Sequence, residues 1–137
     1  MIRTATEIEI PNIKSVMRSV PGLWHEDWRD DVLERAIRAA DGLAYVWADG
    51  ETILGFVCAH DLGFRGYLSL LVVAEGARGR GIGKQLVRQV ERELAARGCA
   101  VLISDVWQGA EGFYRALDWS PPDVLLLRHR LDQWRNG

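Results

Sequence analysis

The chain has 137 residues, of which 48% are hydrophobic and 26% charged, and its formal net charge is -2. These values are typical of one globular domain with a sizeable core, and they exclude collagen-like and low-complexity chains. The lack of a basic balance disfavours nucleic-acid binding, no apolar run is long enough to span a bilayer, and the first residues lack a signal-peptide core. We therefore expect a single cytoplasmic domain over residues 1–137, with no nucleic-acid or membrane partner. Cys58 and Cys99 define neither a disulfide framework nor a metal site.

The first 40 residues predict one strand and two helices. A short strand over 2–6 leads into a helix that ends near Ser19, and Pro11 indicates that this helix begins late. Apolar residues recur at helical spacing between residues 25 and 40. This pattern predicts a second helix, which ends near Asp41-Gly42.

A meander of three antiparallel strands should follow. The runs 43–48 and 52–60 are joined by Asp49-Gly50-Glu51, which is a strong hairpin signal. A turn over 63–66 then leads into an apolar run over 67–73.

The C-terminal half predicts a crossover and a final strand. An apolar stripe at the helical period runs from Ile82 to Leu94, and a continuous apolar strand follows over 100–106. A strand, a helix and a strand in this order form a right-handed crossover with parallel strands. A short helix over 110–117 and a last strand over 124–131 complete an α/β (α+β) fold. Its mixed, mostly antiparallel central sheet should have about six to seven strands with helices on both faces.

The most informative motif is Arg78-Gly79-Arg80-Gly81-Ile82-Gly83-Lys84, which lies between the apolar run 67–73 and the helix that follows. Glycines allow several main-chain N–H groups to converge on a phosphate, since they adopt left-handed conformations and have no Cβ. The first N–H groups of the helix lack intrahelical partners, and the helix dipole is positive at this end. The motif therefore predicts an anion site.

The better-known glycine motifs do not fit these residues. A Walker loop requires a glycine five residues before the Gly-Lys pair and Ser or Thr after it, where this chain has Arg78 and Gln85. A dinucleotide fingerprint requires a third glycine, where the two possible registers place Lys84 or Leu86. An ordinary glycine-rich turn and a binder of other nucleotide phosphates remain as alternatives.

The pattern Arg78-x-x-Gly81-x-Gly83 resembles the coenzyme A pyrophosphate loop of the GCN5-related N-acetyltransferase (GNAT) family. Leu71-x-Val73 precedes it and Ala110-x-x-Phe113-Tyr114 follows it, in the order and spacing that this family uses. The resemblance implies an acetyl-CoA-dependent N-acetyltransferase that acts on a primary amine of a small molecule or protein, as a monomer or homodimer. It implies acetyl-CoA as co-substrate and no metal.

Acyl transfer to an amine requires a base, stabilisation of an oxyanion and a proton for the departing thiolate. By resemblance, Tyr114 is the proton donor, and main-chain N–H groups of the strand before the loop, at Leu71 to Val73, bind the oxyanion where a bulge or splay between two parallel strands exposes them. The implied cofactor-binding residues are Leu71, Val72, Val73, Arg78, Gly79, Arg80, Gly81, Ile82, Gly83, Lys84, Trp107 and Tyr114.

The general base stays open. The strand over 67–73 has no carboxylate, so the glutamate that some family members place there is missing, and Asp61, Asp105, Glu26 and His60 remain as candidates. Asp105, at the end of the strand after the glycine helix, is our candidate catalytic carboxylate, although it could equally cap the next turn.

The acceptor side is also open. Acids between residues 23 and 31 would attract an amine, and Trp24 or Trp28 could stack on a cation, although a packed tryptophan and a solvated helix start explain them equally well. Trp107 replaces an asparagine that often contacts the cofactor arm. A non-catalytic coenzyme A-binding sensor or interaction module is therefore the alternative function.

Overall fold

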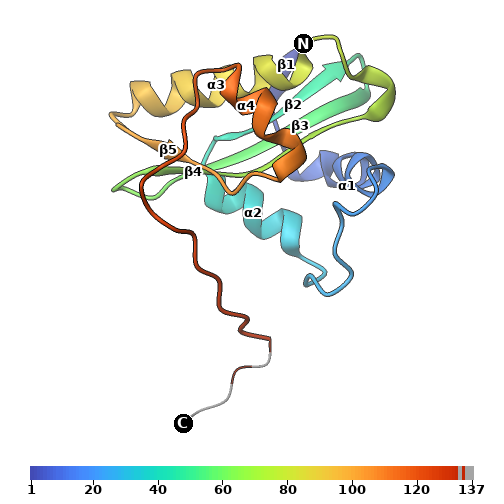
Figure 1. Ribbon diagram of the computed structural model, residues 1–137. Helices are drawn as coiled ribbons and strands as arrows, with labels where there is room; N and C mark the ends of the chain where they lie inside the picture. Colours follow the sequence, from blue (N-terminus) through green and yellow to red (C-terminus); the bar gives the residue numbers. More distant parts are fainter. Residues whose placement is uncertain (133, 135–137) are drawn as a thin grey trace. The chain divides into compact units, whose positions relative to one another are not determined.

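The computed structural model describes residues 1–132 and 134, and the chain divides into two compact units, Met1–Ser104 and Asp105–Gly137. The first unit contains the sheet and three α-helices (Figure 1). Its strands are β1 (Ile2–Thr4), β2 (Ala44–Asp49), β3 (Thr52–Asp61), β4 (Gly66–Val73) and β5 (Leu102–Ile103). Its helices are α1 (Ile10–Ser19), α2 (Val32–Ala40) and α3 (Ile82–Ala96), with 3-10 turns η1 (Glu7–Glu9) and η2 (Glu75–Ala77). The second unit contains η3 (Gln108–Ala110) and α4 (Glu111–Arg115).

The sheet has the strand order β1-β2-β3-β4-β5. The first four strands pair antiparallel, and β5 pairs parallel with β4 after the chain has crossed over through α3. The mixed, mostly antiparallel sheet is therefore confirmed. The expected count of about six to seven strands is wrong, since the described residues form five.

Two of the predicted strands differ from the structure, one in its length and the other because it does not form. The expected strand over 100–106 is reduced to two residues, after which the hydroxyl of Ser104 donates to the carbonyl of Leu68 at 2.8 Å. The expected strand over 124–131 does not form among the described residues, because no described strand pairs with it. Its leucines are exposed, as Leu125 shows with 87% of its surface accessible.

Helices cover both faces of the sheet, as predicted (Figure 1). Successive residues of a strand point to opposite faces. A Cβ on Gly55 would meet Ile82 and Leu86 of α3 at 2.9 and 3.0 Å, so this face of β3 packs against α3. The next residue, Phe56, is fully buried on the side of α1 and α2.

The second helix begins later than its sequence pattern indicates. Residues 25–31 form turns, and α2 begins at Val32. Trp28 N–H donates to the carbonyl of His25 and Val32 N–H to that of Arg29, both at 3.2 Å, which is the spacing of a tight turn rather than an α-helix. The periodic apolar residues before Val32 therefore belong to a turn segment.

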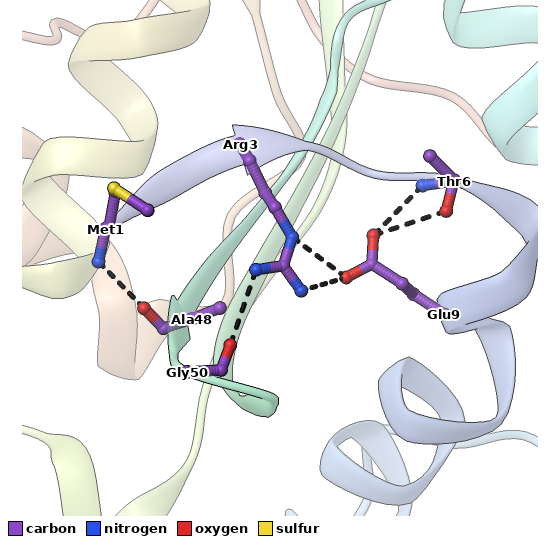
Figure 2. Close-up of polar contacts among 6 residues, drawn as sticks. All are labelled: Met1, Arg3, Thr6, Glu9, Ala48 and Gly50. Carbon is purple, nitrogen blue, oxygen red and sulfur yellow. Dashed lines mark hydrogen bonds and ion pairs between the residues drawn. The ribbon is translucent and has the colours of Figure 1, made fainter.

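A cluster of polar contacts fixes β1 and the start of α1 (Figure 2). The amino group of Met1 donates to the carbonyl of Ala48 at 2.9 Å, and Ala48 N–H donates back at 2.8 Å. Arg3 forms an ion pair with Glu9 at 2.5 Å, and the other carboxylate oxygen of Glu9 accepts from Thr6 N–H at 3.2 Å. This capping box holds the 3-10 turn before α1, so Pro11 falls near the helix start as expected.

None of the helices formed by residues 1–132 is both long and apolar enough to cross a membrane.

Candidate functional site

The turn formed by residues 78–84, which we call the glycine turn, connects η2 to α3. Gly79 and Gly81 have φ values of 80° and 77°, in the left-handed region that favours glycine. A Cβ on Gly79 would meet no heavy atom within 4 Å, and one on Gly81 would meet only Gln85 Nε2 at 3.9 Å. The turn therefore requires glycine for its conformation, and the space beside it is open.

The N-terminus of α3 presents unpaired donors to this space. Gln85 N–H makes the first helical bond, to the carbonyl of Gly81 at 3.0 Å. The N–H groups of Ile82, Gly83 and Lys84 precede this bond and have no partner within the helix. Gly81 supplies no side-chain cap, and the first turn carries no acid. Together with the helix dipole, this arrangement favours an anion.

The side chain of Arg80 lies near an aromatic ring. Its guanidinium carbon lies 5.8 Å from the centroid of the Trp47 ring, within the range of a cation–π contact. Trp47 Nε1 is buried and has no hydrogen-bond partner among the described residues. Arg78, Arg80 and Lys84 are all exposed and give the turn its positive charge.

Strand β4 carries a β-bulge in its pairing with the antiparallel strand β3. The register with β3 changes from Cys58–Leu70 to Ala59–Leu68, so Ser69 is the extra residue of a β-bulge. The sequence predicted a bulge or splay at Leu71 to Val73 between two parallel strands, so the bulge against β3 is a different feature that lies just before that position.

The backbone beyond the bulge offers donors at the β5 edge. Ala74 N–H donates to the carbonyl of Leu54, and hydrogen-bonding directions alternate along an antiparallel pair. The N–H groups of Leu71 and Val73 therefore point away from β3. Since β5 pairs with β4 only opposite Gly66 and Tyr67, these two groups face a side of β4 that β5 does not cover.

A cavity of about 430 Å³, which we call the α2 cavity, lies on the face of the sheet that α1 and α2 cover. It is bounded by α1, the 25–31 turns, α2, β3 and β4. Its lining is mostly apolar, and its polar side chains are Arg29, Arg35, Cys58, His60 and Ser69.

Three of these polar residues form a hydrogen-bonded group. His60 Nε2 lies 2.9 Å from Ser69 Oγ, which donates to the carbonyl of Cys58 at 3.1 Å. The thiol of Cys58 lies 3.9 Å from His60 Nε2 and contacts the carbonyl of Ala36 at 3.6 Å. Burial raises the pKa of the Cys58 thiol to about 11, so the thiol is protonated at neutral pH. The sequence included His60 among several candidates and gave no signal for Ser69, because the strand register that places Ser69 beside His60 has no sequence mark.

Two of the acids before α2 form ion pairs within the chain. Arg18 pairs with Glu26 at 2.9 Å and Arg35 with Asp31 at 2.7 Å. The hydrogen bond from Arg35 lowers the pKa of Asp31.

The tryptophans of this segment are also in contact with neighbours. The Lys14 ammonium lies 5.1 Å and the Arg18 guanidinium 5.0 Å from the centroid of the Trp24 ring. Trp28 stacks on His25, with 4.9 Å between ring centroids. The chain's own cations therefore lie where an acceptor cation was expected to stack.

The remaining predicted site residues belong to the second unit. Tyr114 is buried in α4, with Phe113 and Trp119 packed at 5.0 Å between ring centroids. Burial, and secondly the charge of Asp105, raises the pKa of Tyr114 to about 12. Asp105 is exposed, and Trp107 is 72% exposed.

Within the described part of the chain, no three His, Cys, Asp or Glu residues are grouped so that they could hold a metal ion.

Comparison with known proteins gives a consistent set of similarities. Residues 11–119 match the model of the acetyltransferase (GNAT) family. An acetyltransferase of Yersinia pestis (strain Pestoides F) is 31% identical over 111 residues, which cover 79% of this chain and 77% of that protein.

Solved structures share the fold at lower identity. A transcriptional regulator from Bacillus halodurans C-125 has a TM-score of 0.77 at 22% identity, covering 95% of this chain and 99% of the other. AAC(6')-Iy, solved in complex with the bisubstrate analogue CoA-S-monomethyl-acetylneamine, has a TM-score of 0.74 at 21% identity, covering 95% of this chain and 97% of the other.

Proposed function

The chain belongs to the acetyltransferase (GNAT) family, and on this premise we propose that it transfers the acetyl group of acetyl-CoA to a primary amine bound in the α2 cavity. Family membership makes it an N-acetyltransferase, and the family uses acetyl-CoA as acyl donor. The proposal adds the residues that bind acetyl-CoA, the groups that stabilise the oxyanion and protonate the thiolate, and the kind of acceptor amine.

The glycine turn is the proposed pyrophosphate site. The left-handed Gly79 and Gly81 and the unpaired N–H groups of Ile82, Gly83 and Lys84 fit a diphosphate, because they supply donors and no side chain that would fill the space. The exposed charges of Arg78, Arg80 and Lys84 add attraction. This turn is the observation that carries the proposal.

Strand β4 is the proposed site of the thioester and its oxyanion. The outward N–H groups of Leu71 and Val73 are donors fixed before the reaction, which is the requirement for stabilising developing negative charge. Val72 bonds toward β3, so its part is to hold the strand in position.

The second unit supplies the proposed proton donor. With its raised pKa, Tyr114 retains its phenolic proton at working pH and can give it to the departing thiolate. Asp105 and Trp107 are exposed, and we propose Asp105 as an auxiliary carboxylate and Trp107 as an apolar contact for the pantetheine arm.

The α2 cavity indicates the kind of acceptor. Its lining is mostly apolar and its formal charges are those of Arg29 and Arg35, one of which is paired with Asp31. Positive charge repels a polycation, and an apolar wall favours an apolar body. We therefore propose a primary amine carried on an apolar group, rather than a polyamine or an amino sugar.

Release of coenzyme A from acetyl-CoA tests this function with a panel of amines. We expect turnover with 2-phenylethylamine and isoamylamine. For spermidine and kanamycin we expect kcat/KM at least about 10-fold lower, because these polycations are repelled by the arginines and bring no apolar body to the wall. Binding of acetyl-CoA without turnover across the panel would favour the alternative of a coenzyme A-binding module. A preference for the polycations would contradict the proposed acceptor.

A further inference from the structure

We propose that His60 is the base that removes the proton from the acceptor amine, and that Ser69 positions its imidazole. This inference rests on the proposed function, because it assigns a role in the acceptor cavity. It concerns a different residue type and a different strand from the carboxylate that some family members place on the strand before the loop.

The hydrogen bonds fix one ring nitrogen and leave the other available. Ser69 Oγ donates to the carbonyl of Cys58, so its oxygen accepts from His60 Nε2–H at 2.9 Å. In this tautomer, which the hydrogen-bond network assigns, the lone pair resides on Nδ1. In sites that activate a nucleophile, one nitrogen of the base faces the nucleophile and another group holds the base in position through a hydrogen bond. Here Ser69 is the group that holds the imidazole.

The register of β3 and β4 explains why these two residues meet. Tyr67 lies opposite His60, and side chains two residues apart in a strand point to the same face, so Ser69 shares the face that His60 occupies. The bulge at Ser69 brings Leu70 to this face as well, opposite Cys58. The same bulge precedes the outward N–H groups of Leu71 and Val73, so the positioning residue Ser69 and the proposed oxyanion donors lie on one short stretch of β4, next to His60 on β3.

Among the described residues that line the cavity, no other group can serve as the base. The titratable and charged neighbours of His60 there are Arg29 from the 25–31 turns, Arg35 from α2 and Cys58 from β3. The guanidinium groups remain protonated, and the Cys58 thiol, with its pKa raised to about 11, is protonated as well. No carboxylate is among these described lining residues. Histidine is the side chain that exchanges a proton near neutral pH.

The step balances in protons and electrons. The imidazole lone pair takes a proton from the ammonium, and the N–H electrons become the lone pair of the amine. That pair forms the C–N bond to the acetyl carbon, the C–S bond breaks, and its electrons leave on sulfur. The nitrogen loses two protons in all. The number bound to sulfur rises by one when the thiolate is protonated, and the second proton passes from the imidazolium to water.

His60→Gln tests the role, because glutamine can keep a hydrogen bond to Ser69 but does not titrate. We would measure kcat/KM for 2-phenylethylamine between pH 5.5 and 9.5, together with the dissociation constant of acetyl-CoA. The wild-type rate should rise with pH and level off above the imidazole range, whereas His60→Gln should be about 100-fold slower at pH 7 and rise without levelling. Ser69→Ala should be about 10-fold slower and keep the inflection, as expected for a positioning residue. Affinity for acetyl-CoA should stay within about two-fold in both variants.

His129→Gln is the matched control, since His129 is exposed in the second unit and does not line the cavity. It should retain the wild-type rate and profile. Imidazole added to His60→Ala should restore part of the lost rate.

A wild-type rate and inflection in His60→Gln would overturn the assignment of His60 and leave the proposed function standing. Failure of the wild-type protein to acetylate 2-phenylethylamine while it binds acetyl-CoA would instead overturn the proposed function, and the base with it.

Discussion

Tyr114 is the side chain whose environment best matches a single chemical task. It is 8% exposed, and burial together with the charge of Asp105 raises its pKa to about 12. A phenol with this pKa keeps its proton up to about pH 11, so its ionisation sets no alkaline limit to the rate below that pH.

Tyr114→Phe should lower kcat by about 100-fold and leave the dissociation constant of acetyl-CoA within about two-fold, because the ring is kept and only the proton is lost. The measurement is steady-state coenzyme A release with calorimetric binding alongside. Tyr45→Phe, at a buried tyrosine of β2, is the control and should retain wild-type turnover. A wild-type rate in Tyr114→Phe would remove its proposed role.

At the scale of elements, α4 ends in a conformation that its sequence does not favour. Asp118 has a φ of 71°, in the left-handed region. Trp119 N–H donates to the carbonyl of Tyr114, five residues earlier, at 3.1 Å, which is the 6→1 hydrogen bond of a Schellman motif. Glycine adopts this conformation without a Cβ penalty, whereas an aspartate is strained there. The end of α4 therefore carries strain close in sequence to a proposed functional residue.

Asp118→Gly should raise the free energy of unfolding by about 1 kcal/mol, because it relieves the left-handed strain. Chemical denaturation followed by fluorescence measures this difference. Asp123→Gly is the control, since Asp123 does not have a positive φ, and it should be neutral or destabilising. Equal effects of both substitutions would show that the strain at Asp118 is not stored in the fold.

The elements that the sequence predicts correctly are those defined by local patterns. The stripe from Ile82 to Leu94 has the helical period, and its members Ile82, Leu86, Val87, Val90 and Leu94 are all buried in α3. Gly79 and Gly81 have the left-handed φ that a glycine-rich loop before a helix favours, and Gly83 is the second residue of α3. The hairpin at Asp49-Gly50 forms where the dipeptide indicates.

The features that sequence could not predict depend on pairing between distant residues. The apolar run 124–131 has strand composition, yet a strand needs a neighbour and no described strand pairs with it. The bulge at Ser69 and the start of α2 at Val32 depend on register and packing rather than on composition. The contact between His60 and Ser69 follows from the register of β3 and β4, and the α2 cavity from the packing of α1 and α2 on the sheet, so the proposed acceptor side is the part of the site that required the structure.

At the scale of the whole molecule, the charge of the chain is divided unevenly. Residues 76–98 hold six bases and two acids, a net charge of +4, so the rest of a chain with net charge -2 carries -6. The positive segment includes the glycine turn and α3, which suits a polyanionic substrate at the helix start. Several of these bases are held locally, as Arg88 is by Glu91 at 2.6 Å.

The stability of the molecule should fall in alkaline solution because of Cys58. Its thiol has a pKa of about 11 when folded, against an ordinary value of 9.0, so the unfolded chain loses this proton at lower pH than the folded one. The stabilising difference is fully present below pH 9 and is lost as pH rises toward 11. Between about pH 8 and 11, the free energy of unfolding of the wild type should fall by on the order of 2 kcal/mol more than that of Cys58→Ala.

Urea titrations at a series of pH values measure how steeply the free energy of unfolding falls with pH. Cys99→Ala, at a half-exposed free cysteine, is the control and should follow the wild type. Parallel slopes for wild type and Cys58→Ala would contradict the buried, protonated thiol.

Calorimetric titration of acetyl-CoA into the wild-type protein and into Gly81→Trp tests the central claim, that the glycine turn binds the donor's pyrophosphate through its main chain. Gly50→Trp is the matched control, because Gly50 also has a positive φ, 61°, and open space around it but lies in the β2–β3 turn. We predict saturable binding to the wild type and to Gly50→Trp, and at least about a 100-fold loss of affinity in Gly81→Trp, since a bulky side chain blocks the approach to the N–H groups. No binding to the wild type, or equal affinity in Gly81→Trp, would contradict the account.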